Sequence, residues 1–144
     1  TSPLWQSEAR GVFAGLSLAA AASDVLRSVL EGIAFQIRSN LEVMATLAPV
    51  DELVLFGGGA KSALWADIIC QTSGKPVAVT RIVDVANWGA CLLAGIGAGL
   101  YHADGVSGIP QQHSARIHPV PERVRLYDEL YRAYREAEDR LLRE

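Results

Sequence analysis

Three consecutive glycines interrupt an apolar run near the middle of the 144-residue chain. The run Leu53–Phe56 precedes them, and Ala60, Lys61 and Ser62 follow before a helical pattern begins. Glycine allows positive φ angles and the close approach of a ligand, and the free N–H groups of a helix N-terminus attract anions and polar rings. The pattern therefore predicts a strand, a tight loop and a helix start, and a nucleotide is the first ligand to consider.

Two known phosphate-binding loops can be compared with this run. A P-loop requires a glycine directly before the Lys-Ser pair and another at the start of the loop, where this chain has Ala60 and Leu55. A dinucleotide fingerprint fits slightly better, because Gly57, Gly59 and Ser62 stand at its three positions, although no acidic residue ends the next strand. A dinucleotide-binding, Rossmann-type module of an oxidoreductase therefore stays open as an alternative.

Short apolar runs predict the strands, which we place at Val12–Leu18, Leu53–Phe56 and Val77–Thr80. Helical patterns lie between these runs, so we expect an α/β architecture in which helices flank a short, mostly parallel sheet. A sheet of this size leaves its edges uncovered. We therefore expect the chain to be part of something larger.

The predicted helices have apolar residues at three- and four-residue steps. In chain order we expect helices from a cap at Ser23 to before Pro49, from Ala60 or Lys61 to Gly74, from Asp84 to Gly97, and over 122–143, with an extended connection at 101–121.

Composition excludes several classes of function. The net charge is −3 and the basic residues are scattered, which argues against a nucleic-acid surface. Cys70 and Cys91 are isolated, so we expect two small buried residues and neither a metal site nor a disulfide. The uncharged stretches 11–23 and 85–101 are too short to span a membrane, and we expect both to be buried. No signal peptide opens the chain, so a cytoplasmic location is the default expectation.

Two motifs are similar to those of a known family. The segment Gly11–Leu16, followed after seven residues by Asp24–Glu31, resembles the second signature of the FGGY carbohydrate kinases. The segment Gly57–Trp65 resembles the glycine-rich adenosine loop of the same family, and Ile68–Val77 resembles the segment that follows it. The resemblance extends over nearly the whole chain, because the two motifs occur in the family's order and the closing helix also fits.

The resemblance implies an ATP-dependent sugar kinase with the actin-like, ribonuclease-H-like fold. Residues 1–144 would be the C-terminal portion of its nucleotide-binding lobe, and the acceptor lobe with the aspartate base would be missing. The implied cofactors are ATP and Mg²⁺, and the sugar would be bound through the missing N-terminal lobe. We therefore expect no catalytic or metal-binding residue in this chain and no kinase activity from it alone. Whether the protein is a homo-oligomer stays open.

The resemblance also implies roles for the loop residues. Gly57 would free the turn, Gly58 and Gly59 would present backbone to the adenine and ribose, and Ser62 would offer its hydroxyl to the base, with Ala60 completing the nucleotide-binding set. Spacing alone favours equally a tight strand-to-helix turn in which Ser62 is only a cap.

Neighbouring residues receive weaker assignments. Lys61 could reach a phosphate, but we expect a solvated lysine, and we expect Trp65 and Trp88 to be core residues. His113 and His118 receive no chemical role. The order Ser62, Leu64, Trp65 is most similar to xylulokinases and next to gluconokinases, whereas Trp88 departs from the family pattern; xylulose or a related ketose is therefore the preferred acceptor.

Overall fold

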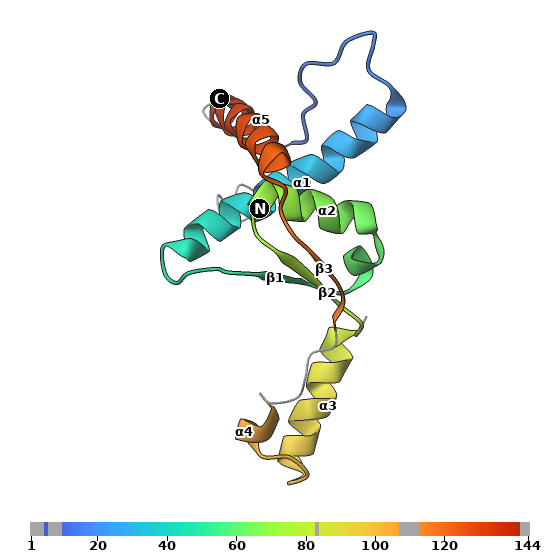
Figure 1. The fold of residues 1–144 in the computed structure, drawn as a ribbon, viewed down its shortest axis with the longest axis vertical. Coiled ribbons are helices and arrows are strands. Elements are labelled where there is room, and N and C mark those ends of the chain that lie inside the picture. The colour runs from blue at the N-terminus through green and yellow to red at the C-terminus, as the bar shows by residue number, and fades with distance from the viewer. Residues whose placement is uncertain (1–4, 6–9, 83, 107–112, 142–144) are drawn as a thin grey trace.

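The computed structural model describes residues 5, 10–82, 84–106 and 113–141 of the chain (Figure 1). Its elements in chain order are α1 (Ala22–Ala45), β1 (Leu53–Leu55), the 3-10 turn η1 (Gly58–Lys61), α2 (Ala63–Ser73), β2 (Val77–Thr80), α3 (Val85–Gly97), α4 (Ala103–Val106), β3 (His113–Ile117) and α5 (Pro121–Leu141). The α/β class predicted from the sequence is confirmed.

The sheet has three strands in the order β1-β2-β3. β1 pairs with β2 in parallel, with Val54 opposite Ala78, and β3 pairs with the other side of β2 in antiparallel fashion, with Ala78 opposite Arg116. The described sheet is therefore mixed, with one parallel and one antiparallel pair, rather than mostly parallel. β2 is central, and its residues Val77, Ala78 and Val79 are all buried.

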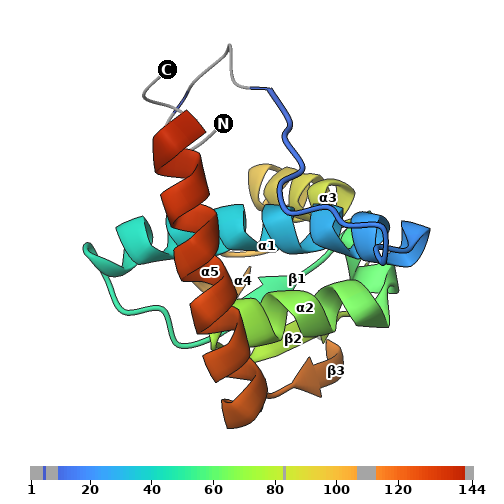
Figure 2. The same cartoon turned by 90° about the horizontal axis from the view of Figure 1, so that it is seen from above.

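The core lies where α1 and α2 cover one side of the sheet. Figure 2 shows the two helices running side by side, with α5 crossing both of them. The buried apolar cluster joins Ala34 of α1 to α2 and β2, and Ile68 of α2 within it has no exposed surface. A second cluster consists of Phe35 on α1 and of Tyr127 and Tyr131 on α5. Helix α5 is therefore attached through aromatic packing against α1 and through its contacts with α2.

The first helix begins slightly earlier than predicted. Its N-cap is Ala21 rather than Ser23, and the carboxylate of Asp24 accepts a hydrogen bond from the Ala21 backbone N–H at 2.9 Å. An acidic side chain in the first turn of a helix satisfies one of the donors that the helix leaves unpaired. Asp24 therefore sets the start of α1, which ends at Ala45, before Pro49 as expected.

The strand predicted at Val12–Leu18 is wrong. These residues form no strand, and Val12, Phe13, Leu16 and Leu18 are exposed. An apolar run becomes a strand only when another strand pairs with its backbone, and no described strand lies beside this one.

The two uncharged stretches are also more exposed than predicted. Residues 11–23 are all exposed. Helix α3 projects away from the sheet (Figure 1), and on it Leu93 is mostly exposed and Trp88 partly exposed. Cys91 on the same helix is exposed, whereas Cys70 is buried as expected. Among the described residues, α3 makes no extensive contact with the sheet or with α1, α2 and α5, so most of its apolar residues lie outside the core.

The segment 101–121 holds more structure than the predicted extended connection. The short helix α4 and the strand β3 both fall within it, while residues 107–112 lie outside the described part of the chain. β3 is mostly exposed and polar, and it exists because its backbone pairs with β2. The final helix begins at Pro121 and is described to Leu141, so the last two residues of the predicted range 122–143 lie outside the description.

Candidate functional site

The candidate site is the loop that leaves the carboxyl end of β1. The backbone there turns at Gly57, which has φ +73° and ψ −156°, a conformation that side chains strongly disfavour. η1 follows over Gly58–Lys61, and Ala60 N–H donates to the Gly57 carbonyl at 3.2 Å. A 3-10 turn thus separates the strand from α2, which begins at Ala63 and not at Ala60 or Lys61 as predicted.

The next two glycines are in different surroundings. A β-carbon built on Gly58 would meet nothing within 4 Å, and the residue is exposed. A β-carbon on Gly59 would lie 3.0 Å from Nε1 and 3.1 Å from Cδ1 of Trp65. Neither residue has a positive φ. Packing against Trp65 therefore disfavours a side chain at Gly59, whereas nothing in the described fold disfavours one at position 58.

Ser62 caps the helix that follows the loop. Its hydroxyl oxygen accepts a hydrogen bond from the Trp65 backbone N–H at 3.2 Å, and its own N–H donates to the Gly59 carbonyl at 3.2 Å. Capping uses a lone pair of the hydroxyl and leaves its proton available for a further acceptor. The structure thus confirms the cap, and Ser62, which is exposed, retains the capacity to donate to a ligand.

The two residues between Gly59 and Ser62 point in different directions. Ala60 is half-buried and packs against the main core cluster, whereas Lys61 is exposed. This placement agrees with the expectation of a solvated lysine. The loop is therefore anchored to the core through Ala60 and presents Gly58, Lys61 and Ser62 on its outer side.

Helix α2 is held at its middle by charged side chains. Arg123 of α5 donates to both carboxylate oxygens of Asp67, and Gln71 donates to Asp67 at 3.0 Å. The hydrogen bond with Arg123 is the main reason that the pKa of Asp67 lies below its ordinary value. Because this carboxylate is engaged within the fold, it acts as a structural anion of α2.

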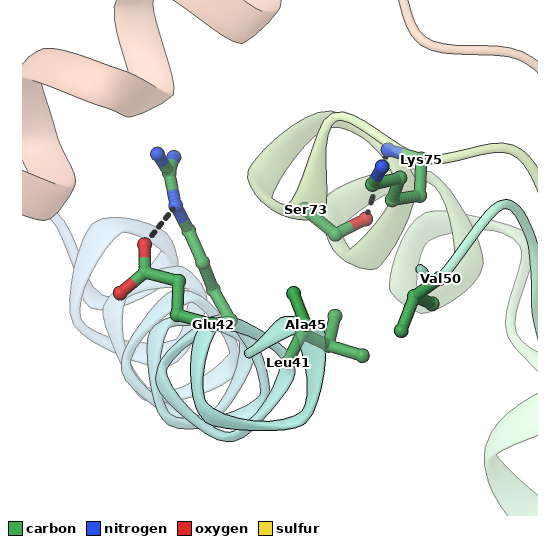
Figure 3. A pocket seen from close by; sticks show the side chains of 7 residues that line it. Leu41, Glu42, Ala45, Val50, Ser73 and Lys75 are labelled. Carbon is green, nitrogen blue, oxygen red and sulfur yellow. Dashed lines mark hydrogen bonds and ion pairs between the residues drawn. The ribbon is translucent and has the colours of Figure 1, made fainter. Parts of the chain in front are cut away.

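A separate hollow lies at the opposite end of α2. It has a volume of about 200 Å³ and lies between the C-terminal ends of α1 and α2, where its lining includes Leu41, Glu42 and Lys75 (Figure 3). Arg38 at its rim is already paired with Glu42 and with Asp128. The hollow does not include any residue of the glycine loop, so it is not part of the candidate site.

The described residues offer neither a metal cluster nor a helix fit to cross a membrane. Within 10–82, 84–106 and 113–141, no group of three or more His, Cys, Asp or Glu side chains is placed to hold a metal ion. Over the same part of the chain, no helix combines the length and the apolar character that crossing a bilayer would need.

The chain matches a family model over most of its length. The model describes the C-terminal domain of the FGGY family of carbohydrate kinases, and it covers residues 1–98. The chain belongs to the FGGY family. The resemblance of the two sequence motifs is thereby confirmed, and the alternative of an oxidoreductase module is not supported.

Individual relatives agree with this assignment. A glycerol kinase of Methylibium petroleiphilum is 31% identical over 137 residues, which are 91% of this chain and 28% of the relative. An autoinducer-2 kinase of Photorhabdus laumondii is 33% identical over 108 residues, or 72% of this chain and 20% of the relative. A crystal structure of a xylulose kinase from Brucella ovis is 32% identical with a TM-score of 0.84, covering 93% of this chain and 28% of its own. The FGGY chain thus spans less than a third of the length of these relatives.

Trp65 is in the core as predicted, but its place beside the loop was not predicted from the sequence. Its side chain packs against the main core cluster, and its indole edge also fills the space beside Gly59 of the loop. The available signal was its position three residues after Ser62, at the end of the same motif. Trp88 is not a core residue in the described fold, because 42% of it is exposed.

Proposed function

We propose that this chain forms the adenosine-binding part of an ATP-dependent sugar kinase, and that the loop Gly57–Ser62 is the binding element. The observation that carries the proposal is Gly58, which is exposed, has an ordinary backbone conformation and would carry a side chain without any clash. Folding does not explain a glycine at such a position. A flat ligand that lies against the backbone does, because any side chain would occupy its place.

The neighbouring groups suit a nucleoside. The hydroxyl of Ser62 can donate to a ring nitrogen of adenine while it continues to cap α2. Gly57 supplies the turn that brings η1 away from the strand, and Ala60 fixes the loop on the core. These residues bind and orient; none of them is a candidate for a base or a nucleophile, so the chemistry of transfer would depend on groups outside this chain.

ATP supplies the phosphoryl group in such a reaction, and Mg²⁺ accompanies its phosphates. The donor set near the loop fits the nucleoside but not the metal. The nearest carboxylate in α2, Asp67, is paired with Arg123, and the described residues include no metal-binding cluster. We therefore assign no ligand of Mg²⁺ to this chain.

We infer that the sugar is xylulose or a related ketose. The support is the order Ser62, Leu64, Trp65 in the loop motif, together with the 32% identity to the Brucella ovis xylulose kinase. Relatives of similar identity are glycerol and autoinducer-2 kinases, so an acceptor panel must contain all three substrate classes. Initial rates with xylulose, glycerol and autoinducer-2 would identify the acceptor, and a preference for glycerol or autoinducer-2 would overturn this choice.

The nucleotide site is tested by Gly58→Val in the natural full-length protein. We expect the KM for ATP to rise by about tenfold or more, because the new side chain fills the space of the ring. The melting temperature should change little, since the side chain meets no protein atom. Gly58→Ala should give a smaller increase, because a methyl group fills less of this space.

Lys61→Ala is the matched control in the same turn. It removes an exposed charge without adding volume, so we expect the KM for ATP to change by no more than about threefold. If Gly58→Val leaves the KM for ATP unchanged in a folded and active protein, the loop is not the nucleotide site. If NAD raises the melting temperature and ADP does not, the kinase interpretation is wrong as well.

A further inference from the structure

The indole of Trp65 lies in the space that a side chain at Gly59 would occupy. A β-carbon at Gly59 would be 3.0 Å from the indole nitrogen, closer than side-chain carbons normally approach such an atom. Gly58 beside it would meet nothing. In a 3-10 turn, which has three residues per turn, the β-carbons of adjacent residues would point in directions about a third of a turn apart. One side of the loop therefore faces open space and another side rests on the indole.

Trp65 is also linked to the other end of the loop. Its backbone N–H donates to the hydroxyl oxygen of Ser62 at 3.2 Å, and Ser62 N–H in turn donates to the Gly59 carbonyl. The side chain of Trp65 packs on the main core cluster, as does Ala60. A single residue thus connects the rigid core with Gly59 and Ser62.

We propose that Trp65 is a positioning residue for the nucleotide loop. Its indole supports Gly59 from the core side and sets how far the Gly58–Gly59 backbone extends toward the adenosine, while its N–H directs the hydroxyl of Ser62. This inference rests on the proposed function of the loop. It adds a residue that touches no ligand and acts through the backbone of Gly59.

The contact predicts a specific dependence between positions 59 and 65. A methyl group at Gly59 would press on the indole, so the loop and the indole must separate by a few tenths of an ångström. Because the core holds the indole in place, we expect the loop to shift, which weakens binding of a ligand on its opposite side. If the indole is absent, the same methyl group meets no obstacle. The effect of Gly59→Ala should therefore depend on whether Trp65 is present.

The test is a double-mutant cycle in the natural full-length protein with Gly59→Ala, Trp65→Leu and both together. We expect Gly59→Ala to raise the KM for ATP by about tenfold, and kcat at saturating ATP to stay within about twofold. Trp65→Leu should raise this KM by about fivefold through loss of support. The double variant should resemble Trp65→Leu alone, rather than show the product of the two increases.

Leu64→Ala is the matched control, because Leu64 adjoins Trp65 on α2 but is 50% exposed. We expect no change in its KM for ATP. Trp65→Phe provides a second variant if leucine prevents folding, and the KM should then lie between those of the wild type and Trp65→Leu.

The outcomes separate this inference from the proposed function. Independent effects of Gly59→Ala and Trp65→Leu, or equal changes in KM and kcat, would overturn the positioning role even if Gly58→Val abolishes binding. If Gly58→Val has no effect on the KM for ATP, the loop is not the nucleotide site, and the positioning role of Trp65 falls with it. If the effects of Gly59→Ala and Trp65→Leu on the KM for ATP are strongly coupled and kcat is unchanged, the positioning role of Trp65 is supported.

Discussion

Asp67 and Arg123 join the helix behind the candidate loop to the last helix of the chain through a two-point contact. Nη1 and Nη2 of Arg123 lie 2.9 Å and 2.5 Å from the two carboxylate oxygens of Asp67. Such a paired geometry fixes the relative orientation of the two side chains. It therefore fixes the position of α2, which carries Ser62 at its N-terminus, relative to α5.

Replacing Arg123 should weaken this attachment. We expect Arg123→Leu to lower the free energy of unfolding by about 1 kcal/mol, because it removes both hydrogen bonds and leaves Asp67 with Gln71 alone. Arg125→Leu on the same helix is the control, since the Arg125–Glu122 pair is at 3.4 Å and both side chains are about 70% exposed. Denaturant titration measures both, and equal losses would contradict the special role of the Asp67 pair.

The same pair should make the stability of the fold depend on pH in the acid range. The Arg123 hydrogen bond lowers the pKa of Asp67 below its ordinary value of 3.8, so the ionised form is favoured by folding. The resulting stability is present above pH 3.8 and is lost as the pH falls through the folded pKa. Wild type should therefore be more stable than Asp67→Asn at neutral pH, and the difference should shrink in strong acid. A difference that is independent of pH would refute this account.

Ser62 should have a measurable structural role that is separate from ligand binding. Ser62→Ala removes the acceptor for the Trp65 N–H, and we expect it to cost about 1 kcal/mol of unfolding free energy. Ser62→Asn should cost much less, because asparagine caps helices as well as serine does. Thermal or denaturant unfolding without nucleotide compares the two, and an equal loss in both would mean that the cap does not stabilise α2.

Two glycine-to-alanine substitutions should change the free energy of unfolding in opposite directions. Gly74 ends α2 with φ +64°, so Gly74→Ala should lower the unfolding free energy by about 1 kcal/mol, although its methyl group would find only an ordinary 3.5 Å contact with Val124. Gly32 lies inside α1 with no atom within 4 Å of a β-carbon and no positive φ. Gly32→Ala should raise the unfolding free energy by about 0.5–1 kcal/mol. Melting temperatures that move in the same direction would contradict this reasoning.

The ionisation of Tyr134 should make the stability of the fold depend on pH in the alkaline range. Burial, with the nearby charge of Glu138 as the next cause, raises the pKa of Tyr134 to about 12. Folding therefore favours the neutral phenol, whose hydroxyl donates to Gln36 at 3.0 Å. Its contribution is present below pH 10 and is lost as the pH rises toward 12. Tyr134→Phe cannot ionise, so its stability should fall less steeply over this range, and identical alkaline profiles would rule out the effect.

The helices and the central strand could be predicted from the sequence because their signals are local. Apolar spacing identifies α1, α2 and α5, and Gly74 marks the end of α2 by its left-handed conformation. The run Val77–Thr80 is apolar because β2 is buried in the middle of the sheet. The loop motif and the Gly11–Glu31 signature identified the family, which the family model confirms.

The errors concern elements that depend on a partner in space. Val12–Leu18 is apolar but has no strand beside it, whereas His113–Ile117 is largely polar and exposed and becomes a strand through its pairing with β2. Backbone hydrogen bonds between strands use no side chain. Composition alone therefore misjudged both segments.

By itself, the sequence determined the family, the order of the main helices and the place of the glycine loop, because each depends on residue types at short spacing. Only the tertiary structure decided that the three glycines differ: Gly57 turns the backbone, Gly59 accommodates Trp65, and Gly58 faces open space. The physical reason is that the need for a glycine comes from the atoms around its missing β-carbon, and at Gly59 those atoms belong to a helix that begins only after the loop has ended.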